Sequence, residues 1–256
     1  MVVRLVDAAS TAQANLGASS EAAASGVYDL LHRATKPYEA EARLLEALII
    51  ERCPGATSLL DVACGTGEHL RHLADSFEVT GIDASAAMLR VATTKLTTVP
   101  LHVADMRTFS LRRPFDAITC LFSSVGYLPD VTGLRLAVSN MADHLTPGGV
   151  LVIEPWHHLD VWSADDTFAE SVTEAGRSVS RILTVSVRDD FSILSMHYTV
   201  SDGGPVREFD EIHRLRLFST DDYVEAIQAA GLSVEHEPVG LSGRGIFIGR
   251  RAVPMG

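Results

Sequence analysis

Short apolar runs alternate with helical stretches over residues 28–154, and this alternation constrains the fold more than any other feature. Continuous apolar runs of strand length are typical of strands that are buried on both faces, as in parallel sheets covered by helices. The pattern therefore predicts a doubly wound, Rossmann-like α/β fold, whose ligands lie at the carboxyl ends of the strands. The expected strands are residues 58–63, 78–82, 101–103, 115–121 and 150–154, and the expected helices are residues 28–53, 68–76, 86–94 and 132–144.

The alternation ends after Trp156, where apolar and polar residues begin to alternate with a period of two. Residues 178–187, 192–200 and 206–218 show this period, which is typical of half-buried strands, and Asp- and Gly-containing turns separate them. We predict an inserted antiparallel sheet over about residues 157–213 that forms a lid.

The remaining boundaries follow from composition and spacing. Residues 1–25 are rich in Ala and Ser and predict a flexible N-terminus, which leaves residues 26–256 as a single domain with its insertion. A helix at 220–230 and a pair of strands at 233–236 and 245–250 are expected to complete the core.

Charge and cysteine content narrow the range of partners. The formal net charge of −12 argues against binding to nucleic acid or to an anionic membrane, because both need a basic surface. The cysteines Cys53, Cys64 and Cys120 are odd in number and form no CxxC pair, so we expect neither a metal site nor a disulfide framework. No apolar run reaches the roughly 18 residues that span a membrane. These features predict a soluble, cytoplasmic protein and leave an anionic small substrate possible if Arg or Lys residues gather locally.

The stretch LLDVACGTGEHL is the densest functional signal. Asp61 ends the first expected strand, and Gly65 and Gly67 allow the backbone to turn tightly against a ligand. The dinucleotide-binding fingerprint needs a third glycine, but Leu70 occupies that position. A NAD-dependent oxidoreductase is therefore disfavoured and stays an alternative.

Two further carboxylates follow the next two strands. Asp83 could accept hydrogen bonds from both ribose hydroxyls of a nucleoside, and Asp105 could accept one from adenine while Met106 covers the ring. Either acid alone could be an ordinary cap or turn residue. Three acids at successive strand ends, the first beside a glycine loop, resemble the cofactor site of class I S-adenosylmethionine-dependent methyltransferases. A cofactor-binding module without catalytic activity is a second alternative.

A narrower resemblance covers residues 28–250. The stretches YDLLH, SLLDVACGTGEHLRHLADSF, DMRTFSL, ITCLFSSVGYL, VIEPWHH, HRLRLF and SGRGIF are similar to those of the N,N-dimethyltransferases of TDP-amino-sugar biosynthesis. The resemblance implies methylation or dimethylation of the amino group of a TDP-linked deoxyamino sugar in antibiotic biosynthesis. It also implies S-adenosylmethionine as cofactor, S-adenosylhomocysteine as product, and a homodimer.

The same resemblance implies roles for individual residues. Tyr28 and Tyr38 should close over the methionine part of the cofactor. Ser124, Glu154 and Trp156 should border the sugar, and Arg244 should hold a phosphate. The expected lining of the cofactor pocket is Ala63, Gly65, Asp83, Met88, Asp105, Met106 and Leu121.

The candidate catalytic residues are Tyr127, His157 and Glu154. An amine attacks a methyl group only when it is neutral, so a proton must leave on binding. His157 could accept that proton or could be a loop histidine that faces water, whereas the Tyr127 hydroxyl is a poor base and is expected to form a hydrogen bond. The family has His at the position of Tyr127, so a sugar hydroxyl or another small amine stays an alternative acceptor.

Overall fold

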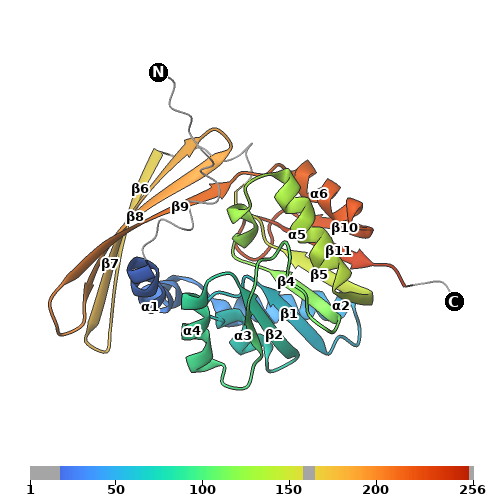
Figure 1. The fold of residues 1–256 in the computed structure, drawn as a ribbon, viewed down its shortest axis with the longest axis horizontal. Helices are drawn as coiled ribbons and strands as arrows, with labels where there is room; N and C mark the ends of the chain where they lie inside the picture. The colour runs from blue at the N-terminus through green and yellow to red at the C-terminus, as the bar shows by residue number, and fades with distance from the viewer. Residues whose placement is uncertain (1–17, 158–164, 254–256) are drawn as a thin grey trace. The chain divides into compact units, whose positions relative to one another are not determined.

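The computed structural model describes residues 18–157 and 165–253, which form two compact units (Figure 1). Among these residues the larger unit comprises 36–157 and 216–253, and the smaller unit comprises 18–35 and 165–215. In this part of the chain no helix is long and apolar enough to cross a bilayer.

A seven-stranded sheet forms the centre of the larger unit, with strand order β10-β11-β5-β4-β1-β2-β3. The first five strands along the chain pair in parallel, and β11 runs antiparallel to both β5 and β10. The doubly wound fold and the terminal antiparallel pair are therefore confirmed. The strands are β1 (Ser58–Val62), β2 (Glu78–Asp83), β3 (Leu101–Val103), β4 (Phe115–Cys120), β5 (Leu145–Ile153), β10 (Leu232–Glu237) and β11 (Ile246–Arg251).

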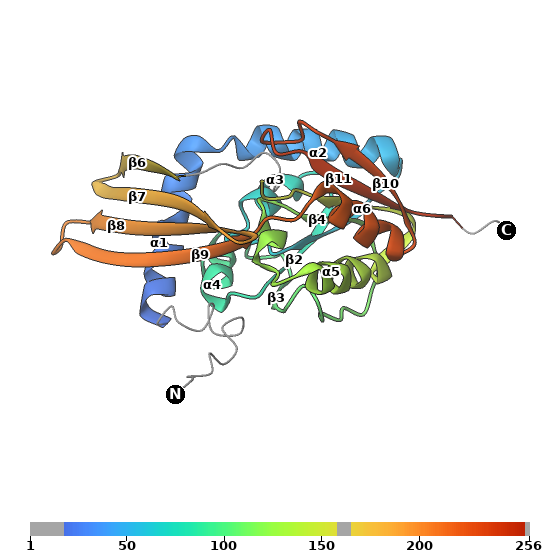
Figure 2. The same ribbon diagram turned by 90° about the horizontal axis from the view of Figure 1, so that it is seen from above.

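Helices cover both faces of this sheet (Figure 2). Neighbouring residues of β1 point to opposite faces: Leu59 packs in the cluster that contains α2, α3 and α4, and Leu60 packs in the cluster that contains α5 and α6. Because both faces are filled, a ligand can reach the sheet only at the strand ends. The helices are α2 (Tyr38–Arg52), α3 (Glu68–Leu73), α4 (Ala86–Lys95), α5 (Val131–Asp143) and α6 (Thr220–Ala229).

The N-terminal segment differs from its prediction. The helix expected over residues 28–53 is two helices, α1 (Ala18–Thr35) and α2, with a break at Pro37. Proline has no backbone N–H and disfavours helical geometry in the residue before it, so a helix ends there. Because α1 begins at Ala18, residues 18–25 are helical, and residues 1–17 lie outside the described part of the chain. The flexible N-terminus stays a prediction.

The smaller unit is a four-stranded antiparallel sheet with strand order β6-β7-β8-β9, and α1 packs against β6 and β7. The predicted antiparallel strands are present, together with β6, which the pattern did not predict. The unit also includes residues 18–35, and the expected single domain from residue 26 with an insertion at 157–213 stays a prediction. A lid function stays a prediction. The strands are β6 (Asp165–Glu174), β7 (Arg177–Arg188), β8 (Phe191–Ser201) and β9 (Arg207–Arg216).

Candidate active site

The loop between β1 and α3 joins two of the predicted cofactor residues directly. The backbone N–H of Gly65 donates a hydrogen bond to Oδ2 of Asp83 at 2.8 Å, and Oδ1 of Asp83 accepts one from the N–H of Ser85 at 2.7 Å. Gly65 and Gly67 have φ angles of +56° and +77°, a left-handed region that glycine enters without steric penalty. A Cβ built on Gly65 meets no other atom within 4 Å, so the loop leaves open space at this point for a ligand.

Three other predicted cofactor residues lie at or just after the ends of strands β1, β2 and β4. Ala63 has a left-handed φ of +59°, and Leu121 is buried directly after β4. Met88 lies in the first turn of α4, where its N–H donates to the hydroxyl of Ser85 at 3.1 Å. The cap residue Ser85 therefore ties the start of α4 to the end of β2.

Asp105 has a partner that the sequence did not predict. Its Oδ1 accepts hydrogen bonds from the backbone N–H of Arg107 at 2.8 Å and from Nε of Arg107 at 3.0 Å. These bonds lower the pKa of Asp105 and hold it ionised. Met106, between the two residues, packs against the core cluster of α5 and α6. Oδ2 of Asp105 accepts further bonds from Nε of Arg107 at 3.2 Å and from Nη2 at 2.5 Å, so a ligand donor would have to share or displace one of these bonds.

Asp61 is buried at the end of β1, where Oδ1 accepts a hydrogen bond from the hydroxyl of Thr119 at 2.8 Å. Burial raises the pKa of Asp61 to about 6, although His69 and Thr119 oppose the shift. Ionisation of Asp61 therefore costs more free energy in the folded protein than in the unfolded chain.

Replacing Asp61 with Asn is expected to stabilise the apoprotein by about 3 kcal/mol at pH 8, because Asn has no charge to bury. The pKa is higher in the folded state, so the stability that Asp61 contributes is complete below pH 3.8 and is lost as the pH rises through about 6. Urea denaturation of both proteins from pH 4 to pH 8 measures the difference. If the free energies of unfolding of the wild type and Asp61→Asn differ by the same amount at pH 4 and at pH 8, burial of the charge is not the cause.

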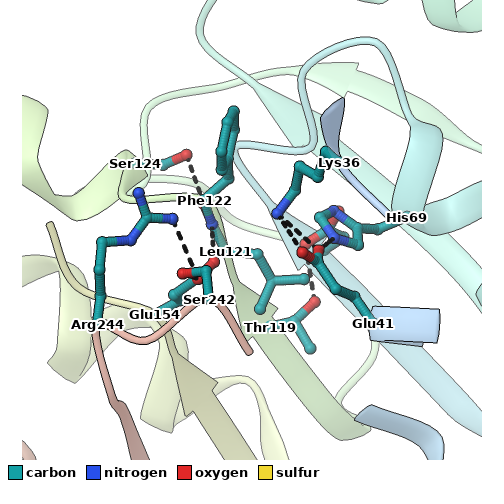
Figure 3. A network of polar contacts seen from close by, with 11 residues as sticks. Lys36, Glu41, His69, Thr119, Leu121, Phe122, Ser124, Glu154, Ser242 and Arg244 are labelled. Atoms are coloured by element: carbon teal, nitrogen blue, oxygen red, sulfur yellow. Dashed lines mark hydrogen bonds and ion pairs between the residues drawn. The ribbon is translucent and has the colours of Figure 1, made fainter. Parts of the chain in front are cut away.

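A second group of residues lies around Glu154, which is fully buried after β5 (Figure 3). Its Oε2 accepts a hydrogen bond from the backbone N–H of Phe122 at 2.7 Å. Its Oε1 accepts hydrogen bonds from the hydroxyl of Ser242 and from Nη2 of Arg244, the latter at 3.1 Å. One carboxylate thus joins the end of β4, the end of β5 and the loop between β10 and β11.

Arg244 is enclosed by aromatic rings. Its guanidinium carbon lies 5.3 Å from the ring centre of Trp156 and 5.6 Å from that of Phe122. The side chain is 11% exposed, and no described residue accepts a hydrogen bond from its buried Nε. The structure therefore brings together three of the residues predicted for the substrate side: Glu154, Trp156 and Arg244.

The sequence did not predict a buried cluster of Lys36, Glu41 and His69 (Figure 3). Nζ of Lys36 lies 2.6 Å from Oε2 of Glu41, and Nε2 of His69 lies 2.8 Å from the same oxygen. Burial acts to raise the pKa of Glu41, but hydrogen bonds from His69 and Lys36 outweigh it and lower the pKa. Nζ of Lys36 also lies 4.4 Å from the ring centre of Phe122. This cluster places a cation beside the end of β4.

The predicted tyrosines occupy different surroundings. Tyr38 is buried, and its ring meets His69 edge-on with centres 4.9 Å apart. Tyr28 lies on α1 in the smaller unit, where its ring centre is 4.2 Å from that of His32. Tyr127 ends the 3₁₀ turn η1 (Ser124–Tyr127) and is 49% exposed.

The last two predicted residues lie beside the Glu154 group. The hydroxyl of Ser124 donates to the carbonyl oxygen of Leu121 at 2.9 Å, so it stabilises the turn after β4. The ring of His157 meets Trp156 edge-on with centres 4.6 Å apart. The neighbouring His158 lies outside the described residues.

Comparison with known proteins identifies the family. A general methyltransferase-domain profile matches residues 59–149. The chain is 45% identical to a dTDP-3-amino-3,6-dideoxy-alpha-D-glucopyranose N,N-dimethyltransferase of Streptomyces fradiae, over 87% of this chain and 89% of the relative. It is 41% identical to a dTDP-4-amino-2,3,4,6-tetradeoxy-D-glucose N,N-dimethyltransferase of Saccharopolyspora spinosa, over 88% and 91%.

A solved structure agrees with these relatives. The SAM-bound amino pentose methyltransferase CalS10 of Micromonospora echinaspora superposes with a TM-score of 0.81 at 38% identity, over 88% of this chain and 97% of that one. With the acid-bearing glycine loop at β1 and β2 and the cation–aromatic group at β4 and β5, these likenesses lead to one conclusion. The chain belongs to the family of S-adenosylmethionine-dependent N,N-dimethyltransferases of TDP-amino sugars.

Proposed function

We propose that this protein transfers methyl groups from S-adenosylmethionine to the amino group of a TDP-linked deoxyamino sugar in antibiotic biosynthesis. The observation that carries the proposal is Arg244, whose side chain is only 11% exposed, whose guanidinium lies near two aromatic rings, and whose donor Nε is used by no described residue. A guanidinium in this setting suits a phosphate of a nucleotide-linked sugar. The names of the relatives, which specify TDP-3-amino and TDP-4-amino sugars, support the same class of substrate.

The residues at the other strand ends fit the cofactor. Asp83 is held by two backbone N–H groups and has lone pairs left for ribose hydroxyls, and the loop is open at Gly65. S-adenosylmethionine, when bound, supplies a methyl group on a positively charged sulfur. We propose that the cofactor is bound by Tyr38, Asp61, Ala63, Gly65, Gly67, Asp83, Met88, Asp105, Met106 and Leu121. The part predicted for Tyr28, on α1 of the smaller unit, stays a prediction.

The protein's part in the reaction is to align the amine and to remove its proton. Alignment at near-attack distance is the main requirement of an in-line methyl transfer. We propose that Ser124 and Trp156 border the sugar, that Tyr127 forms a hydrogen bond with it, and that His157, held edge-on against Trp156, accepts the proton. The carboxylate of Glu154, also predicted as a catalytic residue, already accepts hydrogen bonds from three protein donors.

Product mass tests the proposed reaction. The purified protein is incubated with S-adenosylmethionine and a panel of TDP-3-amino and TDP-4-amino sugars, and the products are analysed by mass spectrometry. We expect one member to gain one and then two methyl groups, which also identifies the position of the amine. Calorimetric titration with S-adenosylhomocysteine serves as the control for an intact cofactor site. Cofactor binding without methylation of any amino sugar would contradict the proposal and redirect the search to hydroxyl acceptors.

A further inference from the structure

Glu154 lies where a catalytic base is expected, but its contacts are those of an anchor. Its carboxylate is fully buried and accepts hydrogen bonds from the N–H of Phe122, the hydroxyl of Ser242 and Nη2 of Arg244. To accept a proton from an amine, this carboxylate would have to give up one of these bonds, and the released donor would be left without a partner in a buried site. The arrangement therefore opposes a role as proton acceptor.

The segment that Glu154 holds has an unfavourable backbone. Phe122 and Ser123 are consecutive non-glycine residues with φ angles of +51° and +68°. Such conformations persist only where surrounding contacts hold them. The bond from the Phe122 N–H to Glu154 is one such contact, and the bond from the Ser123 hydroxyl to the carbonyl oxygen of Pro155, at 3.2 Å, is another. Glu154 thus helps to fix the turn that carries Ser124 and Tyr127.

The same carboxylate fixes the orientation of Arg244. The bond from Nη2 to Oε1 of Glu154 and the rings of Phe122 and Trp156 restrict how the guanidinium can rotate. Nε then has no acceptor among the described residues. A side chain that is ordered in advance loses less conformational entropy when it binds a ligand. Arg244 is therefore prepared for an anion before the substrate arrives.

We propose that Glu154 is a positioning residue that acts on the nucleotide end of the substrate through Arg244, and not a proton acceptor. The proposal rests on the proposed function for the identity of the substrate. The proposal requires that substitutions of Glu154 and Arg244 have coupled effects on the KM for the TDP-amino sugar, because Glu154 acts on the substrate through the arginine. A base would instead affect the chemical step independently of Arg244.

The substitution Glu154→Gln separates the two roles. Gln matches the shape of Glu but has one acceptor oxygen and one donor group, so it cannot satisfy donors on both sides. For a positioning residue, we expect the KM for the TDP-amino sugar to rise about tenfold and kcat to change less than about threefold. The pH profile of kcat should keep its wild-type shape. A fall in kcat of about 100-fold or more with an unchanged KM, or loss of one limb of the profile, would identify a base and overturn the proposal.

A double-mutant cycle gives the sharper test. The rise in KM that Glu154→Gln causes should be clearly smaller in the Arg244→Ala background than in the wild-type background, because only the turn at Phe122 is then left for Glu154 to position. Independent, multiplying effects on KM would overturn the proposal. Glu235→Gln makes the same chemical change at an exposed carboxylate of β10 and is the matched control. Its kcat and its KM for the TDP-amino sugar should equal the wild-type values.

Equilibrium binding of TDP keeps the proposal testable if the wild-type protein methylates no amino sugar. Glu154→Gln should weaken TDP binding about tenfold and leave the affinity for S-adenosylhomocysteine unchanged. That result without turnover would refute the proposed reaction and support the positioning role. Failure of the wild-type protein to bind TDP, or equal TDP affinity of wild type and Glu154→Gln, would refute the positioning role itself. A thermal melt of each variant checks that it is folded.

Discussion

Replacing Arg244 with Ala is expected to raise the KM for the TDP-amino sugar about 100-fold, since charge-assisted hydrogen bonds to a phosphate contribute a few kcal/mol. The affinity for S-adenosylhomocysteine should stay within about twofold of wild type, because Arg244 contacts Glu154 and two aromatic rings and not the glycine loop. The protein carries a net charge of −12, so a local cation is especially important for attracting an anionic substrate. Steady-state kinetics with each substrate varied in turn measures both effects.

Arg244→Lys is the matched variant for this prediction. It keeps a positive charge beside Glu154 but loses the planar guanidinium that lies near the rings of Phe122 and Trp156, so an intermediate KM is expected. The comparison matters because Ala also leaves the buried Glu154 without its cation, which lowers stability. Assays therefore run well below the melting temperature of each variant. A wild-type KM in Arg244→Ala would remove Arg244 from the substrate site.

Asp83→Ala is expected to weaken S-adenosylhomocysteine binding about 100-fold. The substitution removes the acceptor for the N–H groups of Gly65 and Ser85, so the loop loses the bonds that shape it, and the proposed ribose acceptor is lost as well. Asp83→Asn keeps one carbonyl oxygen and should give a smaller loss of affinity. Isothermal titration calorimetry measures the dissociation constants of all three proteins.

Asp116 provides a matched control for that experiment. Like Asp83, it accepts hydrogen bonds from backbone N–H groups, those of Thr57 and Ser58, but it lies at the amino end of the same sheet. Asp116→Ala should lower the melting temperature and leave S-adenosylhomocysteine affinity at the wild-type value. Equal losses of affinity in Asp83→Ala and Asp116→Ala would show that the effect is general destabilisation and would contradict the specific role of Asp83.

The sequence alone determined the features that depend on local order along the chain. Parallel strands and helices follow from the period of apolar residues, and the glycine loop with Asp61 and Asp83 follows from where the strands end. These signals are local because a strand and the turn after it lie within about ten residues of each other. The family resemblance added Trp156 and Arg244, which the structure places in one group.

Only the tertiary structure decided which of these groups touch and which charges are already paired. Glu154 and Arg244 are 90 residues apart, and Glu41 and His69 are 28 apart, so no local period predicts either contact. The grouping of α1 with β6 and β7 is equally non-local. A sequence pattern specifies which face of an element is buried, but the partner that a polar side chain meets depends on how distant elements pack. The three donors that surround Glu154, predicted as a catalytic residue, could not be foreseen for this reason.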